Sequence, residues 1–280
     1  MGSYPTPPHD GSILPPDAGY APTPQPVRRP RRLWAVAPAT YLLVGINCAV
    51  FLAMAASHVG LWNPSPESLL HWGANNAGAV LINGQWWRIV TAMFVHVGII
   101  HLATNMWCLW NLGLLAEPLL GSAGVAAAYI LTGAAGNLLS TFVSRVWYYH
   151  PAEVSAGLFG PVGAGASGAV FGLAGVLIVL LKSPQLPIPQ HELRGLRRSV
   201  IYFAAINLLI GVATMIPGSL VHIDNMAHLG GFSCGLLFAT PLVPRIGAPR
   251  DLFSFRRRVA VVMIVVLLSL FAYYLAQFRA

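Results

Sequence analysis

The stretch from residue 165 to residue 181 reads GASGAVFGLAGVLIVLL and contains no charged side chain. Inside lipid, an open-ended segment can satisfy its backbone hydrogen bonds only as a helix. An apolar run of this kind therefore predicts a membrane helix, which we place at 166–181. It is slightly shorter than the roughly 20 residues that cross a hydrocarbon core about 30 Å thick.

Six other apolar stretches of similar length occur in the chain, and together they predict an all-α polytopic membrane protein with seven spans. The composition agrees, because 56% of the 280 residues are apolar, 9% are charged and the mean hydropathy is +0.66. Soluble domains carry about 25% charged residues, and outer-membrane barrels show short alternating segments instead of long apolar runs. The expected spans are 39–57, 97–115, 123–143, 166–181, 200–216, 225–242 and 259–276.

The chain divides into three parts by composition. Residues 1–36 contain nine of the 22 prolines and no apolar periodicity, which is typical of a disordered tail. Residues 37–243 contain the first six spans and form the expected helical core. Residues 244–280 form a basic loop followed by the seventh span.

Basic residues indicate the orientation of these spans. If the tail is cytoplasmic and the spans alternate, thirteen of the 16 Lys and Arg residues lie on the cytoplasmic side, and only Arg88, Arg145 and Arg279 lie outside. Positive charge is enriched in cytoplasmic loops. The net charge of +8 is thereby explained without a nucleic-acid partner, and we expect a multi-pass protein of a cell membrane, in this case a bacterial plasma membrane.

Tryptophan is concentrated in the first outside loop, at 58–95. Trp62, Trp72, Trp86 and Trp87 lie there, and tryptophan prefers the membrane–water interface. We expect this loop to lie in the outer leaflet, although an ordinary aromatic belt would have the same composition.

Two glycine-rich motifs place polar groups inside spans, where polar groups indicate function. Ser167 is flanked by Gly165 and Gly168, which would let a substrate backbone approach its hydroxyl. His228 shares a helix face with Gly231 and Gly235, because these residues follow it at i+3 and i+7. Gly168 and Gly172 are four residues apart and form a second glycine face. Packing of the two glycine faces would bring a serine close to a base, as nucleophilic catalysis requires.

A third motif contains His96, His101 and Asn105. His101 and Asn105 are four residues apart and project from one side of a helix, where both could donate hydrogen bonds to an oxyanion. A zinc site is the competing interpretation. No HExxH motif occurs, and Cys48, Cys108 and Cys234 have no metal-ligand spacing, so we expect neither a metal nor another cofactor.

These motifs, taken together and in order, resemble the rhomboid family of intramembrane serine proteases. The similarity extends over about 84–240 and over the whole six-helix core when the first span is included, and the seventh span resembles the six-plus-one arrangement of part of the family. The matching residues are Trp87 and Arg88, His96, His101 and Asn105, Glu117 and Gly121, Gly165, Ser167 and Gly168, and His228, Gly231 and Gly235.

The resemblance implies a catalytic dyad without a third acid. Ser167 would be the nucleophile and His228 the general base and then the acid. His101, Asn105 and the Ser167 amide would form the oxyanion hole. Phe171 would stack on the histidine, and Asp224 is interpreted as a loop residue.

The resemblance also implies an environment and a substrate class. Loops around His96, His150 and His222 would form a polar cavity open to the outside, and the fifth span with 217–224 would be a gate. The expected partners are transmembrane protein substrates and the lipid bilayer. The alternatives are an inactive relative that binds membrane clients, and a small transporter or channel. The sequence does not determine the substrate or the oligomeric state.

Overall fold

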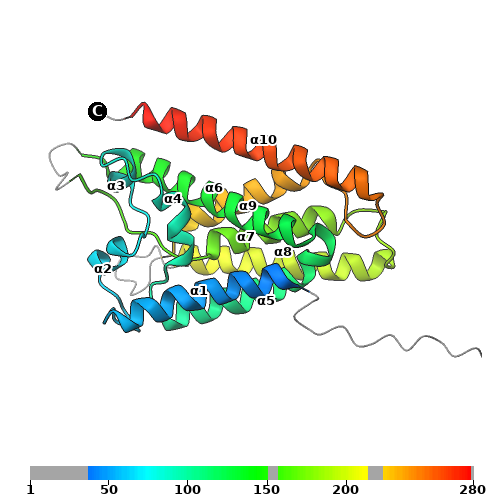
Figure 1. Ribbon diagram of the computed structural model, residues 1–280, viewed down its shortest axis with the longest axis horizontal. Coiled ribbons are helices and arrows are strands. Elements are labelled where there is room, and N and C mark those ends of the chain that lie inside the picture. The colour runs from blue at the N-terminus through cyan, green and yellow to red at the C-terminus, as the bar shows by residue number, and fades with distance from the viewer. Residues whose placement is uncertain (1–36, 151–156, 214–222, 279–280) are drawn as a thin grey trace, which may run out of the picture. The chain divides into compact units, whose positions relative to one another are not determined.

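The computed structural model describes residues 37–150, 157–213 and 223–278, and every regular element in these ranges is a helix. Figure 1 shows the helices colour-coded along the chain. Their bounds are α1 Pro38–Ala56, α2 Pro66–His71, α3 Ala77–Leu81, α4 Arg88–Thr91, the 3₁₀ turn η2 Ala92–Phe94, α5 Ile99–Leu120, α6 Ser122–Tyr148, α7 Ser167–Leu180, α8 Gln190–Ala213, α9 Asn225–Ala239 and α10 Arg250–Ala276.

Five of the described helices, namely α1, α5, α6, α8 and α10, are long and apolar enough to cross a membrane. The prediction of an all-helical polytopic membrane protein is therefore confirmed, whereas the count of seven spans and the orientation remain predictions. The helices α7 and α9 have 14 and 15 residues. At 1.5 Å per residue, they extend only about 21 to 23 Å.

Two helices begin about ten residues before the corresponding predicted spans. The fifth predicted span began at 200 and the seventh at 259, but α8 begins at Gln190 and α10 at Arg250. The arginines at 194, 197, 198 and 256–258 consequently lie in helices rather than in loops. A hydropathy pattern detects only the apolar part of a helix, whereas backbone hydrogen bonding continues through helix-forming charged residues.

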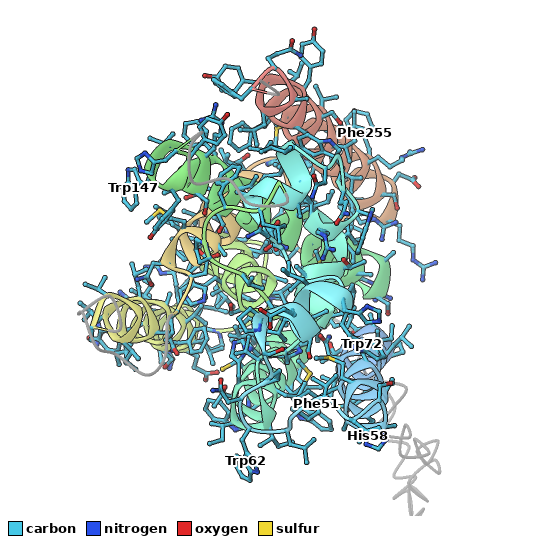
Figure 2. The ribbon with its side chains drawn as sticks, turned by 90° about the vertical axis from the view of Figure 1, so that its left-hand side faces the viewer. Phe51, His58, Trp62, Trp72, Trp147 and Phe255 are labelled. Carbon is cyan, nitrogen blue, oxygen red and sulfur yellow. The ribbon has the colours of Figure 1, made fainter. Side chains whose placement is uncertain are left out.

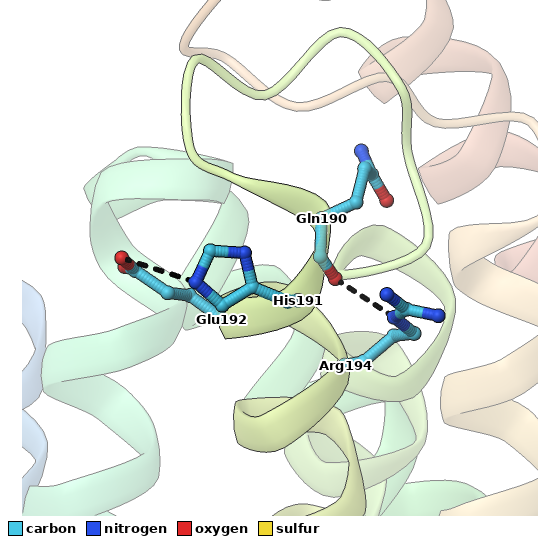
Figure 3. Close-up of polar contacts among 4 residues, drawn as sticks. All are labelled: Gln190, His191, Glu192 and Arg194. Carbon is cyan, nitrogen blue, oxygen red and sulfur yellow. Dashed lines mark hydrogen bonds and ion pairs between the residues drawn. The ribbon is translucent and has the colours of Figure 1, made fainter.

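The first turn of α8 carries polar side-chain contacts (Figure 3). The Arg194 Nε donates to the Gln190 carbonyl at 3.3 Å, and the His191 Nε2 lies 4.0 Å from a carboxylate oxygen of Glu192. Glu192 lies in the first turn, where a negative charge interacts favourably with the helix dipole.

The helix α7 forms the centre of the packed helices. Every residue from 168 to 177 is buried, and α6 and α9 are its main neighbours. The helices α8 and α10 lie at the other extreme, because 17% of the most apolar part of each is buried, against 67% for α6. Figure 2 shows α8, in yellow, beside the other helices.

The segment 57–98 contains the short helices α2, α3 and α4, which lie together at one end of the long helices (Figure 1). Trp62 is 73% exposed and Trp147 is 58% exposed, and both side chains point outward in Figure 2. The helix α10 contributes to the same end, because Leu275 belongs to an apolar cluster with Val80 and Leu81 of α3.

Candidate active site

Ser167 is the first residue of α7, and the backbone before it explains why the helix begins there. Gly165 has φ +131°, a conformation that favours glycine and that interrupts any helix. The N-cap residue is Ala166, which has no side chain able to cap the helix. The first N–H groups of α7 therefore lack the side-chain acceptor that helix starts commonly have.

His101 and Asn105 of α5 face Gly165, which lies two positions before Ser167. A Cβ atom placed on Gly165 would lie 2.5 Å from the His101 Cε1 and 3.6 Å from the Asn105 Nδ2. The Asn105 Nδ2 donates to the His101 carbonyl at 3.0 Å, and the His101 Nδ1 is buried without a hydrogen-bond partner. Two side chains able to donate hydrogen bonds thus lie beside the start of α7.

His96 lies in the segment before α5 and is fully buried against the segment before α7. Its Nδ1 lies 3.3 Å from the Phe94 carbonyl, and its Nε2 accepts a hydrogen bond from the Ala166 N–H at 3.4 Å. Burial, together with the neighbouring His101, lowers the pKa of His96 to about 3. A neutral His96 with a proton on Nδ1 satisfies both contacts and holds the backbone next to Ser167.

His96 itself is buried, and the open polar cavity expected around His96, His150 and His222 remains a prediction. His150 is exposed after the end of α6, and His222 lies outside the described residues. Two cavities occur elsewhere on the described surface, about 400 Å³ beside Trp107 and about 320 Å³ beside Arg88, and neither is lined by Ser167 or His228.

His228 lies in the first turn of α9, and an aromatic ring holds its imidazole. The Phe171 ring stacks on it with centroids 4.2 Å apart and an interplanar angle of 12°. The His228 Nδ1 is buried without a hydrogen-bond partner. Among the described residues, no carboxylate therefore bonds to this nitrogen.

The helices α7 and α9 approach each other through glycines, as their spacing suggested. A Cβ atom placed on Gly231 would overlap the carbonyl oxygen of Gly168, and one on Gly235 would overlap that of Gly172. The Cβ position of Gly172 faces a different helix, since a Cβ atom there would overlap Thr132 of α6. Close packing of small residues thus joins the helix that carries Ser167 to the helix that carries His228.

The Ser167 hydroxyl and the His228 imidazole form no hydrogen bond with each other among the bonds of the described residues. Catalytic hydrogen bonds are often long without substrate and shorten in the reacting complex. The structure therefore places the two residues at the starts of two packed helices, and the dyad itself remains a prediction.

The other predicted residues lie outside this cluster. Glu117, near the end of α5, accepts hydrogen bonds from the Ala39 and Thr40 N–H groups at 2.9 Å each, and Gly121 follows this helix with φ +68°. These contacts join the end of α5 to the start of α1.

Trp87 and Arg88 belong to the segment that contains α2, α3 and α4. The Arg88 guanidinium donates to the carbonyls of Leu70 and Ala74 at 2.6 and 2.8 Å and to the Gln85 side chain at 2.6 Å. The Trp87 ring packs on this guanidinium at 4.4 Å from its centroid. Both residues stabilise the fold of this segment and contact neither Ser167 nor His228 in the contacts described.

Sequence reasoning missed the roles of Asp224 and Asn225. Asp224 is not merely a loop residue, because its Oδ1 caps α9 by accepting from the Ala227 N–H at 2.9 Å. Asn225 is buried against Gly211 of α8, and both polar atoms of its amide lack hydrogen-bond partners. The signal for the cap was an Asp at the start of an apolar run, whereas nothing in the sequence indicated the burial of Asn225.

In residues 37–150, 157–213 and 223–278, no group of three or more His, Cys, Asp or Glu residues is arranged to hold a metal ion. The expectation that the protein needs no cofactor remains untested.

Comparison with known proteins identifies relatives for most of the chain. The family profile for the Rhomboid domain matches residues 83–245. The Rhomboid protease GluP of Bacillus subtilis (strain 168) is 30% identical over 236 residues, which cover 84% of this chain and 40% of that protein. The Rhomboid protease AarA of Providencia stuartii is 29% identical over 208 residues, covering 71% of this chain and 70% of AarA.

A plant protein shows the same pattern of partial coverage. RHOMBOID-like protein 1 of Arabidopsis thaliana is 33% identical over 177 residues, which cover 63% of this chain and 40% of the plant protein. The chain thus spans about 40% of the length of GluP and of the plant protein.

Proposed function

Because the chain belongs to the rhomboid family, we propose that it is an intramembrane serine endopeptidase that hydrolyses peptide bonds in or near the transmembrane segments of membrane proteins. Ser167 is the proposed nucleophile, and His228 is the proposed general base and acid. The observation that carries the proposal is the joining of their helices through Gly168 and Gly231 beside the donor pair His101 and Asn105.

In the first step, His228 takes the proton of the Ser167 hydroxyl while the serine oxygen attacks the carbonyl carbon of the substrate. A serine hydroxyl is a weak nucleophile at its ordinary pKa and needs such a base. Stacking on Phe171 holds the imidazole in one plane, which replaces part of the orientation that a third acidic residue supplies in a triad.

Negative charge then develops on the carbonyl oxygen, and the start of α7 is suited to stabilise it. The uncapped N–H groups of the first turn and the positive end of the helix dipole favour an anion at this point. Donors from His101 and Asn105 would complete the oxyanion hole. Stabilisation of this kind is usually the largest single contribution to acyl-transfer catalysis.

Collapse of the tetrahedral intermediate breaks the C–N bond, and His228 gives its proton to the departing amine. The acyl group remains on Ser167. Water then attacks this ester with His228 again acting as base, which releases the acid product and restores the serine. The reaction consumes one water and needs no cofactor.

The proposed setting is a seven-span protein with a cytoplasmic N-terminus and an active site open to the extracytoplasmic side. The distribution of basic residues supports this orientation, since thirteen of the 16 lie on the cytoplasmic side when seven spans alternate. The lightly buried helix α8 is the proposed route for a substrate segment to reach Ser167. A bacterial plasma membrane and transmembrane protein substrates complete the proposal.

The function is tested with purified full-length protein and a model single-span substrate in liposomes, with and without a fluorophosphonate that reacts with activated serines. We expect cleavage near the substrate's transmembrane segment, its loss after treatment, and covalent labelling of Ser167 identified by mass spectrometry. Binding of the substrate without cleavage or labelling would instead indicate an inactive, client-binding protein.

Removal of either proposed oxyanion donor should slow turnover without abolishing it. Loss of one such donor typically costs on the order of 10²–10³ in rate, so His101→Ala and Asn105→Ala should each lower kcat to this extent. KM should change little, because these donors act mainly in the transition state.

A matched control lies on the same helix. Asn111 is exposed on α5 and donates to the Trp107 carbonyl, so Asn111→Ala makes the same chemical change away from Ser167. Its kcat should equal that of the wild type. Equal kcat for Asn105→Ala and Asn111→Ala would exclude Asn105 from the oxyanion hole.

A further inference from the structure

The carboxylate of Asp224 connects two helices at the point where α9 begins. Its Oδ1 accepts from the Ala227 N–H at 2.9 Å, and its Oδ2 accepts from the hydroxyl of Ser140 on α6 at 2.5 Å. Ser140 is buried. Bonds from a hydroxyl to a carboxylate are shorter and stronger than those between neutral groups, so this contact is a firm connection between α6 and α9.

The same turn of α9 carries His228. The His228 N–H donates to the Asp224 carbonyl at 3.1 Å, so the backbone of the histidine is bonded directly to the residue that joins Ser140. A second contact supports the first, because a Cβ atom on Gly136 of α6 would lie 2.5 Å from the Ala227 carbonyl oxygen. The backbones of α6 and α9 therefore touch beside the Asp224–Ser140 bond.

No polar anchor of the His228 side chain occurs among the hydrogen bonds of the described residues. Its Nδ1 is buried without a hydrogen-bond partner, and its one described ring contact is the stack on Phe171. A stack restrains the tilt of a ring but allows it to slide within its plane. The position of the reactive nitrogen along that plane therefore depends on the backbone of the first turn of α9.

We propose that Asp224 is a positioning residue, which places His228 for its reaction with Ser167 by joining the first turn of α9 to Ser140. This inference rests on the proposed function. Asp224 does not act as a third catalytic acid, because its two oxygens are bonded to Ala227 and Ser140 while the His228 Nδ1 lacks a partner.

The connection also extends toward the serine. A Cβ atom on Gly163 would lie 3.3 Å from the Asp224 Oδ2, and Gly163 pairs with Asn75 through two backbone hydrogen bonds of 2.7 and 2.9 Å. The segment that leads to Ser167 thus lies against the same carboxylate. Asp224 thus lies close to the backbone that leads to Ser167 and to the backbone of the turn that carries His228.

The test uses the full-length protein in liposomes and four variants: Ser140→Ala, Asp224→Ala, their double variant and Asp224→Asn. Three assays are used: steady-state cleavage of a single-span substrate, which gives kcat and KM; the rate of Ser167 labelling by a fluorophosphonate; and hydrogen–deuterium exchange of peptides covering 224–231. Ser144→Ala is the matched control, because Ser144 is also a buried serine of α6 but contacts the segment at Gly160.

We expect Ser140→Ala and Asp224→Ala to lower kcat and the labelling rate together, by up to about 10²-fold, since a displacement of about 1 Å can cost this much. KM should stay within about twofold because substrate contacts are retained. The double variant should be no worse than Asp224→Ala. Exchange at 224–231 should rise in these variants and remain at the wild-type level in Ser144→Ala.

Asp224→Asn separates positioning from acid catalysis. Asn caps helices about as well as Asp and retains a polar contact with Ser140, so this variant should recover most of the activity lost in Asp224→Ala. Activity as low as that of Asp224→Ala would contradict positioning and favour an acid that orients the imidazole, where the Asn substitution is severe.

Wild-type kcat and exchange in Ser140→Ala would overturn the proposal and reduce Asp224 to a helix cap. The exchange measurement does not depend on activity. If the wild-type protein neither cleaves nor reacts with the probe, the proposed function fails, and unchanged exchange in Ser140→Ala would still show separately that Asp224 does not anchor α9.

Discussion

Ser167→Ala should eliminate cleavage while leaving the fold intact. In serine proteases, loss of the nucleophile lowers kcat on the order of 10⁶-fold, so cleavage should fall to background. The fold should persist because the Ser167 hydroxyl makes none of the hydrogen bonds described for this chain, and alanine is the better helix former. The check is substrate cleavage in liposomes together with the melting temperature in detergent.

His228→Ala should be as inactive as Ser167→Ala, because an alcohol without a base remains protonated. The double variant should be no worse than either single variant, since residues that act as a unit do not contribute additively. Activity well above background in Ser167→Ala would remove this residue as the nucleophile. Multiplicative losses in the double variant would show that the two residues act independently.

Gly231→Val should both inactivate the protein and destabilise it. Even a methyl group on Gly231 would overlap the Gly168 carbonyl, so valine must push α9 away from α7. Overpacking typically costs about 1–3 kcal/mol of unfolding free energy, and a shift of about 1 Å in catalytic geometry can cost on the order of 10² in rate. We expect a melting temperature lower by several degrees and cleavage close to background.

Gly45→Val provides a matched control for this variant. Gly45 lies on an exposed face of α1, and a Cβ atom there has no neighbour within 4 Å. The same substitution in another membrane helix should therefore leave cleavage and melting temperature close to the wild-type values. A Gly231→Val protein as stable and active as Gly45→Val would disprove the packing of α7 on α9 through this face.

The pairing of glycine faces was accessible from the sequence because it depends on helical periodicity. His228, Gly231 and Gly235 lie on one face of any helix that contains them, whatever surrounds it. The direction that Gly172 faces was not accessible in this way. It approaches α6 at Thr132, which depends on a third helix whose placement no local spacing encodes.

The polar contacts near His228 show the same division. An Asp at the start of a helix predicts a cap for general reasons, but the partner of its second oxygen, Ser140, is 84 residues away in the chain. His96 was identified from its motif, but its burial against Ala166 depends on a segment 70 residues away in the chain. Hydrogen bonds between distant segments form only after the helices pack.

The sequence by itself determined the membrane class, the approximate helices and a set of candidate site residues, because hydropathy, helical period and side-chain type are local properties. The tertiary structure alone decided how far α8 and α10 extend, which face of α7 meets α9, and that Asp224 joins Ser140 beside His228. The physical reason is that packing and buried polar pairing depend on surfaces contributed by segments far apart in the chain. These contacts join the helix that begins at the candidate nucleophile to the helix whose first turn carries the candidate base, and no single segment contains that information.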